Sequence, residues 1–225
     1  MSEITSVEPQ KKKPDRFNVF VDGKFALGLD AETLVKSGLK VGQEISEKEV
    51  EKLVLANETN KLLEKALRFL SFRPHSECEI RDHLRKRVSR SQSVKVSRRA
   101  AGAIDATDTI DTVIGRLRHL GYVNDSEFAR WWVEQRQTHR PRGRQLIKSE
   151  LYQKGIAQEI IDQVLPEDEE SEIERALETA RKKLRSYKNL KPLEFKQKMS
   201  QYLVRRGFSW EVIKEMFDQL TGLEK

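Results

Sequence analysis

The side chains best able to act chemically in this sequence are its arginines and lysines, which gather in three clusters without acidic residues. The clusters span residues 85–99, 136–148 and 181–191. Cations grouped in this way bind phosphates and carboxylates, with an affinity that falls as salt rises. The candidate binding residues are Arg85, Lys86, Arg87, Arg90, Lys95, Arg98, Arg99, Arg136, Arg140, Arg142, Arg144, Lys148, Lys182, Lys183, Arg185, Arg205 and Arg206.

Any one of these clusters could be a solvated helix face that only keeps the protein soluble. Three acid-free clusters near corresponding helix corners favour a surface that faces a polyanion. Trp131 and Trp210 could stack on bases, although aromatic residues at helical spacing are more often core residues. Because exposed charges contribute little to folding, replacing Arg142 and Arg144 by Glu should weaken binding more than stability.

Catalytic chemistry is not indicated. The sequence has no glycine-rich phosphate loop, and its histidines, His75, His83, His119 and His139, have no carboxylate or cysteine partners at metal-ligand spacing. Cys78 is the single cysteine, so an internal disulfide is impossible and a reducing compartment is indicated. We expect no enzyme activity, no metal and no cofactor.

The composition favours a thin helical protein with a polyanionic partner. Apolar residues are 37% and charged residues 35% of the 225, so little core material is available, and the net charge of +7 favours an acidic partner. The first residues form no secretion signal, and no apolar run is long enough to span a membrane. A cytoplasmic location without a membrane partner is therefore expected.

Local signals predict a short β-segment followed by helices. Asp22-Gly23 lies between two alternating runs, which is typical of a hairpin with a type I′ turn. The patterns Ser46-x-x-Glu49, Ser76-x-x-Glu79 and Ser171-x-x-Glu174 are capping boxes that open helices. Gly38 ends a short helix over residues 31–36.

The stretch "HLGYVNDSEFARWWVEQR" predicts a sharp corner between two helices. Gly121 can take the left-handed conformation that ends one helix, and Asn124 or Asp125 can cap the next. Phe128 and Trp132 lie four residues apart and so share one face of that next helix.

An internal repeat organises the rest of the chain. "LYQKGIAQEIIDQVL" (151–165) and "LVRRGFSWEVIKEMF" (203–217) align without gaps at an offset of 52 residues. We predict an all-α fold, an elongated tandem array of three three-helix repeats with a small N-terminal β-hairpin segment. The expected segments are a disordered tail (1–15), a hairpin with short helices (16–60), repeat one (61–125, with a basic insertion at 88–108), repeat two (126–166) and repeat three (171–222).

Three stretches of this sequence resemble the RecX family of proteins that regulate the RecA recombinase. They are "ALRFLSFRPHSECEIRDHL", "LGYVNDSEFARWWVEQR" and "GRQLIKSELYQKGI", in family order, and the similarity covers about residues 17–220. The matched motif positions, most of which look architectural, are Arg73, Ser76, Glu79, Leu84, Gly121, Tyr122, Asp125, Phe128, Trp132, Arg136, Gly143, Glu150, Leu151, Lys154 and Gly155. The insertion at 88–108 departs from the family pattern.

The resemblance implies three tandem three-helix repeats and a regulator without catalytic activity. Such a protein binds the RecA–DNA filament and DNA itself, single- or double-stranded. It inhibits the ATPase, strand exchange and SOS coprotease activities of RecA. We expect it to act as a monomer. The alternative is a helical DNA-binding protein that acts independently of RecA.

Overall fold

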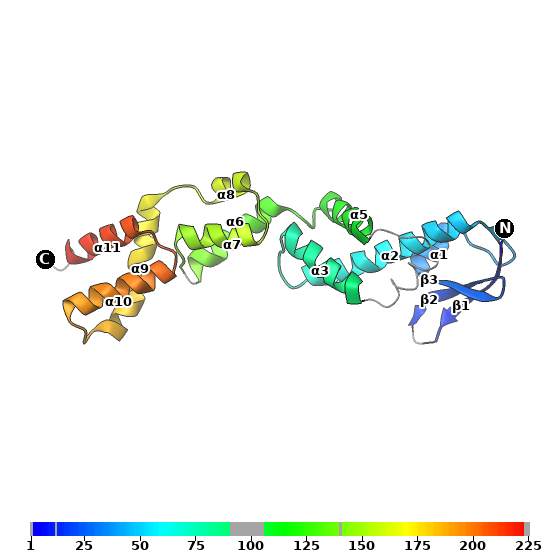
Figure 1. Cartoon of the computed structure of the whole chain (residues 1–225), viewed down its shortest axis with the longest axis horizontal. Coiled ribbons are helices and arrows are strands. Elements are labelled where there is room, and N and C mark those ends of the chain that lie inside the picture. The colour runs from blue at the N-terminus through cyan, green and yellow to red at the C-terminus, as the bar shows by residue number, and fades with distance from the viewer. Residues whose placement is uncertain (1, 12, 91–105, 140, 223–225) are drawn as a thin grey trace. The chain divides into compact units, whose positions relative to one another are not determined.

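The computed structural model describes residues 2–11, 13–90, 106–139 and 141–222 (Figure 1). Two compact units divide the chain. The first unit comprises residues 1–73 and 80–123, and the second comprises residues 74–79 and 124–225. The candidate residues Lys95, Arg98, Arg99 and Arg140, together with most of the insertion at 88–108, lie outside the described residues.

A four-stranded antiparallel sheet opens the first unit. Its strands are β1 (Ser2–Gln10), β2 (Lys13–Val21), β3 (Lys24–Asp30) and β4 (Glu44–Ile45), in the order β3-β2-β1-β4. The predicted hairpin is confirmed, since β2 and β3 meet at Asp22 (φ 49°) and Gly23 (φ 74°).

The prediction of a disordered tail over residues 1–15 is wrong. Strand β1 lies between β2 and β4, and Ile4 is completely buried in the core beneath the sheet. A register shift between Ile4 and Ser6 breaks the alternation of apolar and polar residues. The sequence of this polar segment therefore lacks the pattern by which a strand is recognised.

Two helices cover one face of the sheet. The short α1 (Ala31–Ser37) begins at Asp30 and ends at Gly38, whose φ of 62° is left-handed. The 24-residue α2 (Glu47–Leu70) begins with the predicted capping box of Ser46 and Glu49. Leu53 and Val54 of α2 contribute to the sheet core, and residues further along the same helix enter the next core.

The second core of the first unit lies among α2, α3 (Glu77–Arg90) and α5 (Ala106–His119). It contains Leu62 of α2, Leu84 of α3 and Ile114 of α5, all buried. After α5 the chain turns at Gly121 (φ 75°), where the Tyr122 N–H donates to the Leu117 carbonyl at 2.9 Å. This is the predicted helix-ending glycine.

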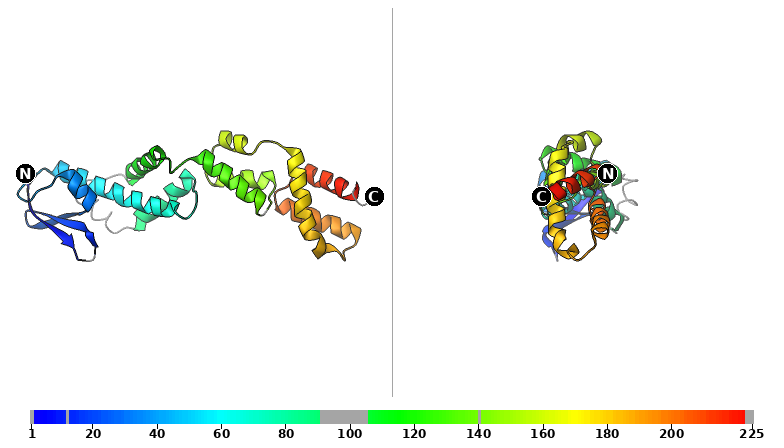
Figure 2. Two further views of the ribbon diagram at one scale, coloured as in Figure 1. Left: turned by 180° about the vertical axis from the view of Figure 1, so that it is seen from behind. Right: turned by 90° about the vertical axis from the view of Figure 1, so that its left-hand side faces the viewer.

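The second unit contains two further sets of three helices. The first set is α6 (Asp125–Thr138), α7 (Arg144–Gln153) and α8 (Gln158–Val164), and the second is α9 (Glu169–Tyr187), α10 (Pro192–Arg205) and α11 (Trp210–Gly222). Each set has its own core, and α9 packs against both α10 and α11 (Figure 2). All-α repeats with a small N-terminal β-segment are confirmed.

The helix starts of the second unit confirm one predicted cap and correct another. Asn124 accepts hydrogen bonds from the N–H groups of Ser126 and Glu127, as its position before α6 predicts. The capping box predicted at Ser171 is wrong, because Asp168 caps α9 three residues earlier and accepts from the Ser171 N–H. The bonds from the Ser171 side chain and N–H hold the pKa of Asp168 below its usual value.

Glycines make close junctions between successive repeats of the second unit. The Gly143 N–H, before α7, donates to the Arg206 carbonyl at 2.8 Å, and an added Cβ on Gly143 would lie 2.2 Å from Gly207. At the equivalent corner, where Lys154 lies 52 residues before Arg206, the Ser76 hydroxyl donates to the Lys154 carbonyl at 2.7 Å. The same junction therefore occurs twice. In each case the start of the second helix of one repeat contacts the corner that ends the second helix of the next repeat.

Candidate functional site

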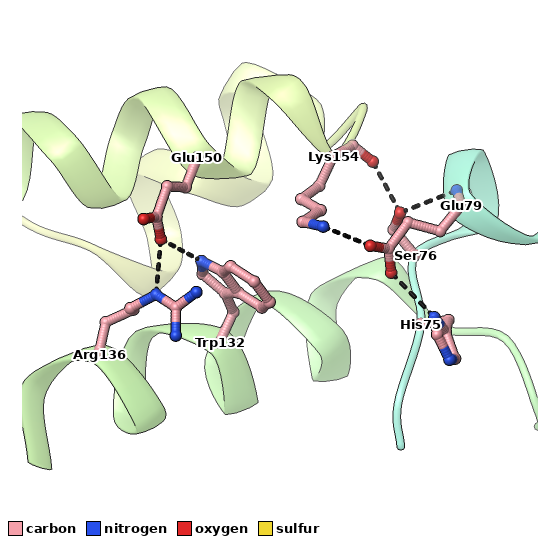
Figure 3. Close-up of polar contacts among 7 residues, drawn as sticks. All are labelled: His75, Ser76, Glu79, Trp132, Arg136, Glu150 and Lys154. Atoms are coloured by element: carbon pink, nitrogen blue, oxygen red, sulfur yellow. Dashed lines mark hydrogen bonds and ion pairs between the residues drawn. The ribbon is translucent and has the colours of Figure 1, made fainter. Parts of the chain in front are cut away.

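The second basic cluster is organised around the carboxylate of Glu150 on α7 (Figure 3). Its Oε2 accepts hydrogen bonds from Trp132 Nε1 at 2.8 Å and from Arg136 Nε at 2.7 Å, and its Oε1 pairs with Arg142. The Arg136 guanidinium also lies 4.0 Å from the centre of the Trp132 ring. Glu150 is 15% exposed, so this carboxylate largely neutralises two of the candidate arginines inside the second unit.

The other described cations of this cluster also have partners within the unit. The Arg144 N–H donates to Glu172 at 2.9 Å, and the guanidinium pairs with Glu167 at 3.2 Å. Lys148 lies 3.7 Å from Asp162. Arg142 and Arg144 are therefore not simple surface charges, because Glu150 of α7 and Glu167, which lies between α8 and α9, pair with them.

Lys154 is a structural cation at the repeat junction. Its Nζ pairs with Glu79 and lies 4.8 Å from the centre of the Trp132 ring, while its carbonyl accepts from Ser76 (Figure 3). The second Glu79 oxygen lies 3.0 Å from His75 Nδ1, and His75 is buried. The predicted capping box is thus half formed, since the Glu79 N–H donates to Ser76 at 3.2 Å but its carboxylate binds Lys154 and His75.

The cations of the third repeat are held differently, by aromatic rings. Lys183 of α9 lies 5.5 Å from the centre of the Tyr187 ring and 5.7 Å from that of Tyr202, and Arg206 lies 5.2 Å from that of Tyr202. Within the described ranges neither Lys183 nor Arg206 forms an ion pair with a carboxylate, and the neighbouring Arg205 is exposed. We call Lys183, Tyr187, Tyr202, Arg205 and Arg206 the repeat-three cation–aromatic surface.

The remaining candidate cations differ in their exposure and in whether they form ion pairs. Lys182 pairs with Glu178 at 2.6 Å, and Arg185 is exposed near the end of α9. On α3, Arg85 lies 3.3 Å from Asp82, and Lys86 and Arg87 are exposed. Arg90 ends α3, but its side chain lies outside the described part of the chain.

The tryptophans divide between core and surface. Trp131 packs against the core formed by Phe128 and Trp132, whereas Trp210, at the start of α11, is 58% exposed. The sequence reading missed Tyr187 and Tyr202, although each lies four residues from its cation, Lys183 and Arg206. That helical spacing was the available signal.

The arrangement can bind anions, and nothing described in it points to bond-making chemistry. In the described ranges, no three His, Cys, Asp or Glu side chains come together in a way that could hold a metal ion. No helix in these ranges combines the length and apolar character that a membrane span requires. The fold defines a helical-repeat protein built from sets of three helices.

Comparisons with known proteins define the family. Four family models match: the regulatory protein RecX N-terminal domain over 2–46, and the first, second and third RecX three-helix domains over 63–89, 124–165 and 169–217. Regulatory protein RecX of Bacillus subtilis is 34% identical over 98% of this chain and 78% of its own length. That of Listeria welshimeri is 34% identical over 94% of this chain and 73% of its own length.

A solved structure agrees with the sequence comparison. A crystal structure of regulatory protein RecX, 26% identical, covers 97% of this chain and 100% of its own with a TM-score of 0.70. This chain belongs to the RecX family of regulatory proteins, as its motifs indicated.

Proposed function

We propose that this chain regulates the RecA recombinase by binding the RecA–DNA filament and inhibiting its ATPase, strand exchange and SOS coprotease activities. Family membership supports a regulatory role, and the net charge of +7 favours an anionic filament as the partner. Charge complementarity of this kind speeds encounter and makes binding sensitive to salt.

One observation carries the proposal, namely the repeat-three cation–aromatic surface. The tyrosine rings hold Lys183 and Arg206 in position without cancelling their charge, which leaves their hydrogen-bond donors available to phosphate or carboxylate oxygens. Arg205 and Arg185 extend this surface. The exposed Lys86 and Arg87 of α3, with Lys95, Arg98 and Arg99, would form a secondary contact.

The second cluster has a different part in this proposal. Because Arg136, Arg142 and Arg144 are already bound to carboxylates, they contribute mainly by fixing the second repeat and by their long-range field. Lys148, which lies farther from its partner than they do, is the member of this cluster that a filament could recruit most readily.

The test is the single-stranded-DNA-dependent ATP hydrolysis of RecA from the same organism, with the full chain titrated at substoichiometric ratios. The double variant Lys183→Gln/Arg206→Gln should raise the half-inhibitory concentration about tenfold, because each lost charged contact removes part of the complementarity. The matched control is Lys198→Gln/Lys214→Gln, which removes two charges from exposed lysines of the same repeat that are not members of the repeat-three cation–aromatic surface. The control should change inhibition less than about twofold.

Equal losses in both double variants would mean that only net charge matters, and no loss in either would place the contact elsewhere. The alternative, a DNA-binding protein independent of RecA, draws on the same surface, because aromatic rings beside cations also suit bases and phosphates. It predicts no effect on RecA until the DNA itself is saturated, and a steep loss of duplex binding with salt.

A further inference from the structure

The first unit carries an open groove lined by residues of α1, α2 and α5. The main hollow has a volume of about 620 Å³, and a second of about 490 Å³ continues along α5. Thr112 and Arg116 line both hollows, so the two form one groove. The groove belongs to the first unit, whereas the repeat-three cation–aromatic surface belongs to the second, and it does not depend on the function proposed above.

The walls of this groove are helix faces tied together by side-chain hydrogen bonds. Arg116 of α5 donates to Asn60 of α2 at 3.2 Å, and Asn60 donates to Thr33 of α1 at 2.9 Å. Thr33 in turn donates to Asp30, the cap of α1. The groove is therefore a feature built across three helices.

Gly115 keeps the second hollow open. It lies in the interior of α5, where glycine destabilises a helix relative to alanine, and a Cβ built on it meets nothing within 4 Å. The space that a side chain would fill is thus left free beside Arg116. The missing side chain leaves room for a partner's backbone to approach α5 at this point.

The lining combines apolar and cationic side chains. Leu55 is 40% exposed, and Leu120, which directly follows α5, is 58% exposed. Lys36, Lys52 and Arg116 line the groove, whereas no aspartate or glutamate lines either hollow. An occupant should therefore present apolar side chains flanked by carboxylates.

We propose that this groove binds an acidic amphipathic helix of a partner protein. Helical walls have satisfied backbone hydrogen bonds and offer no strand edge, so an extended peptide would leave its own backbone groups unpaired in the groove. A helix satisfies its backbone internally and can place leucine-like anchors on Leu55 while its carboxylates reach Lys52 and Arg116. The apolar side chains of the lining favour such a helix over the phosphates of a nucleic acid.

The probe is a fluorescein-labelled peptide of about 18 residues, with Leu at helical spacing and Glu elsewhere. Fluorescence anisotropy measures its binding to the full chain. Gly115→Leu, which fills the hollow, and Lys52→Glu, which reverses a rim charge, should each weaken binding about tenfold or more. The matched control is Lys65→Glu, on an exposed part of α2 that does not line the groove, and it should change binding less than about twofold.

Equal binding by the parent chain, Gly115→Leu and Lys52→Glu would overturn the proposal, as would equal binding of a scrambled peptide of the same composition. If a single-stranded oligonucleotide displaces the peptide and loses affinity in the same variants, the groove is a nucleic-acid site instead. A concentration-dependent dimer in sedimentation that Gly115→Leu abolishes would assign it to a second copy.

Circular dichroism checks the fold of each variant. If Gly115→Leu fails to fold, the Lys52→Glu and Lys65→Glu pair still decides.

Discussion

Replacing Gly143 by alanine should separate the second and third repeats at their closest point of contact. The added methyl would lie 2.2 Å from the carbonyl carbon and oxygen of Gly207 and 2.3 Å from the Phe208 nitrogen, all of them backbone atoms. The φ of Gly143 is −69°, which alanine adopts freely, so the substitution introduces no local backbone strain. The start of α7 must instead move away from the corner between α10 and α11.

The cost follows from two losses. Forcing a methyl group into a closely packed contact costs about 1–3 kcal/mol. The hydrogen bond from the Gly143 N–H to the Arg206 carbonyl stretches or breaks, and its loss costs about 0.5–1.5 kcal/mol. The free energy of unfolding of the second unit should therefore fall by about 2–4 kcal/mol.

Urea denaturation followed by tryptophan fluorescence measures this change, since Trp131, Trp132 and Trp210 are the only tryptophans and all lie in the second unit. Gly115→Ala is the control, because it is the same substitution at a helical glycine with open space around it. It should raise the stability of the first unit by about 0.5–1 kcal/mol, seen in far-ultraviolet circular dichroism. An unchanged or higher midpoint for Gly143→Ala would refute the close junction.

Three further results are expected. Phe128→Ala removes the ring of a side chain that is 2% exposed and should lower the free energy of unfolding by about 3–5 kcal/mol in urea denaturation. An unchanged free energy of unfolding would contradict its place in the core. Glu150→Gln keeps the shape but removes the charge facing Arg136 and should cost about 1–3 kcal/mol, whereas no loss would mean that the pair is solvated. Partial burial alone raises the pKa of Asp30, but hydrogen bonds from Thr33 outweigh it and hold the pKa below the usual value. The stabilising effect of Asp30 is therefore present above its pKa in the unfolded chain and is lost as pH falls through its lower pKa in the folded protein. Asp30→Asn should therefore make the free energy of unfolding depend less on pH in the acid range.

Features fixed by neighbours in the sequence could be predicted from it. Gly121 and Asn124 lie three residues apart, and each acts on backbone groups within its own turn, so residue type alone identifies the corner. The same holds for Asp22-Gly23, which needs only its own positive φ angles. The offset of 52 residues likewise identified the repeated corner that Gly155 and Gly207 form, both with left-handed φ.

Features fixed by distant partners could not be predicted. Strand β1 is polar and bulged, and its place in the sheet depends on pairing with β2 and β4. Two residues near the start of α9 are able to cap a helix, Asp168 and Ser171, and the fold uses Asp168. An acid-free stretch of sequence also does not remain acid-free once folded, as Glu167 and Glu172 show by binding Arg144 from outside the cluster.

The repeat itself explains why the basic clusters differ. The offset of 52 residues places Tyr202 of the third repeat where the second repeat has Glu150. A carboxylate at this position draws Arg136 and Arg142 inward and cancels their charge. A tyrosine ring at the same position holds Arg206 by its face and leaves the positive charge in place. The two repeats thus hold their cations differently at this position, by a carboxylate in the second and by a tyrosine ring in the third.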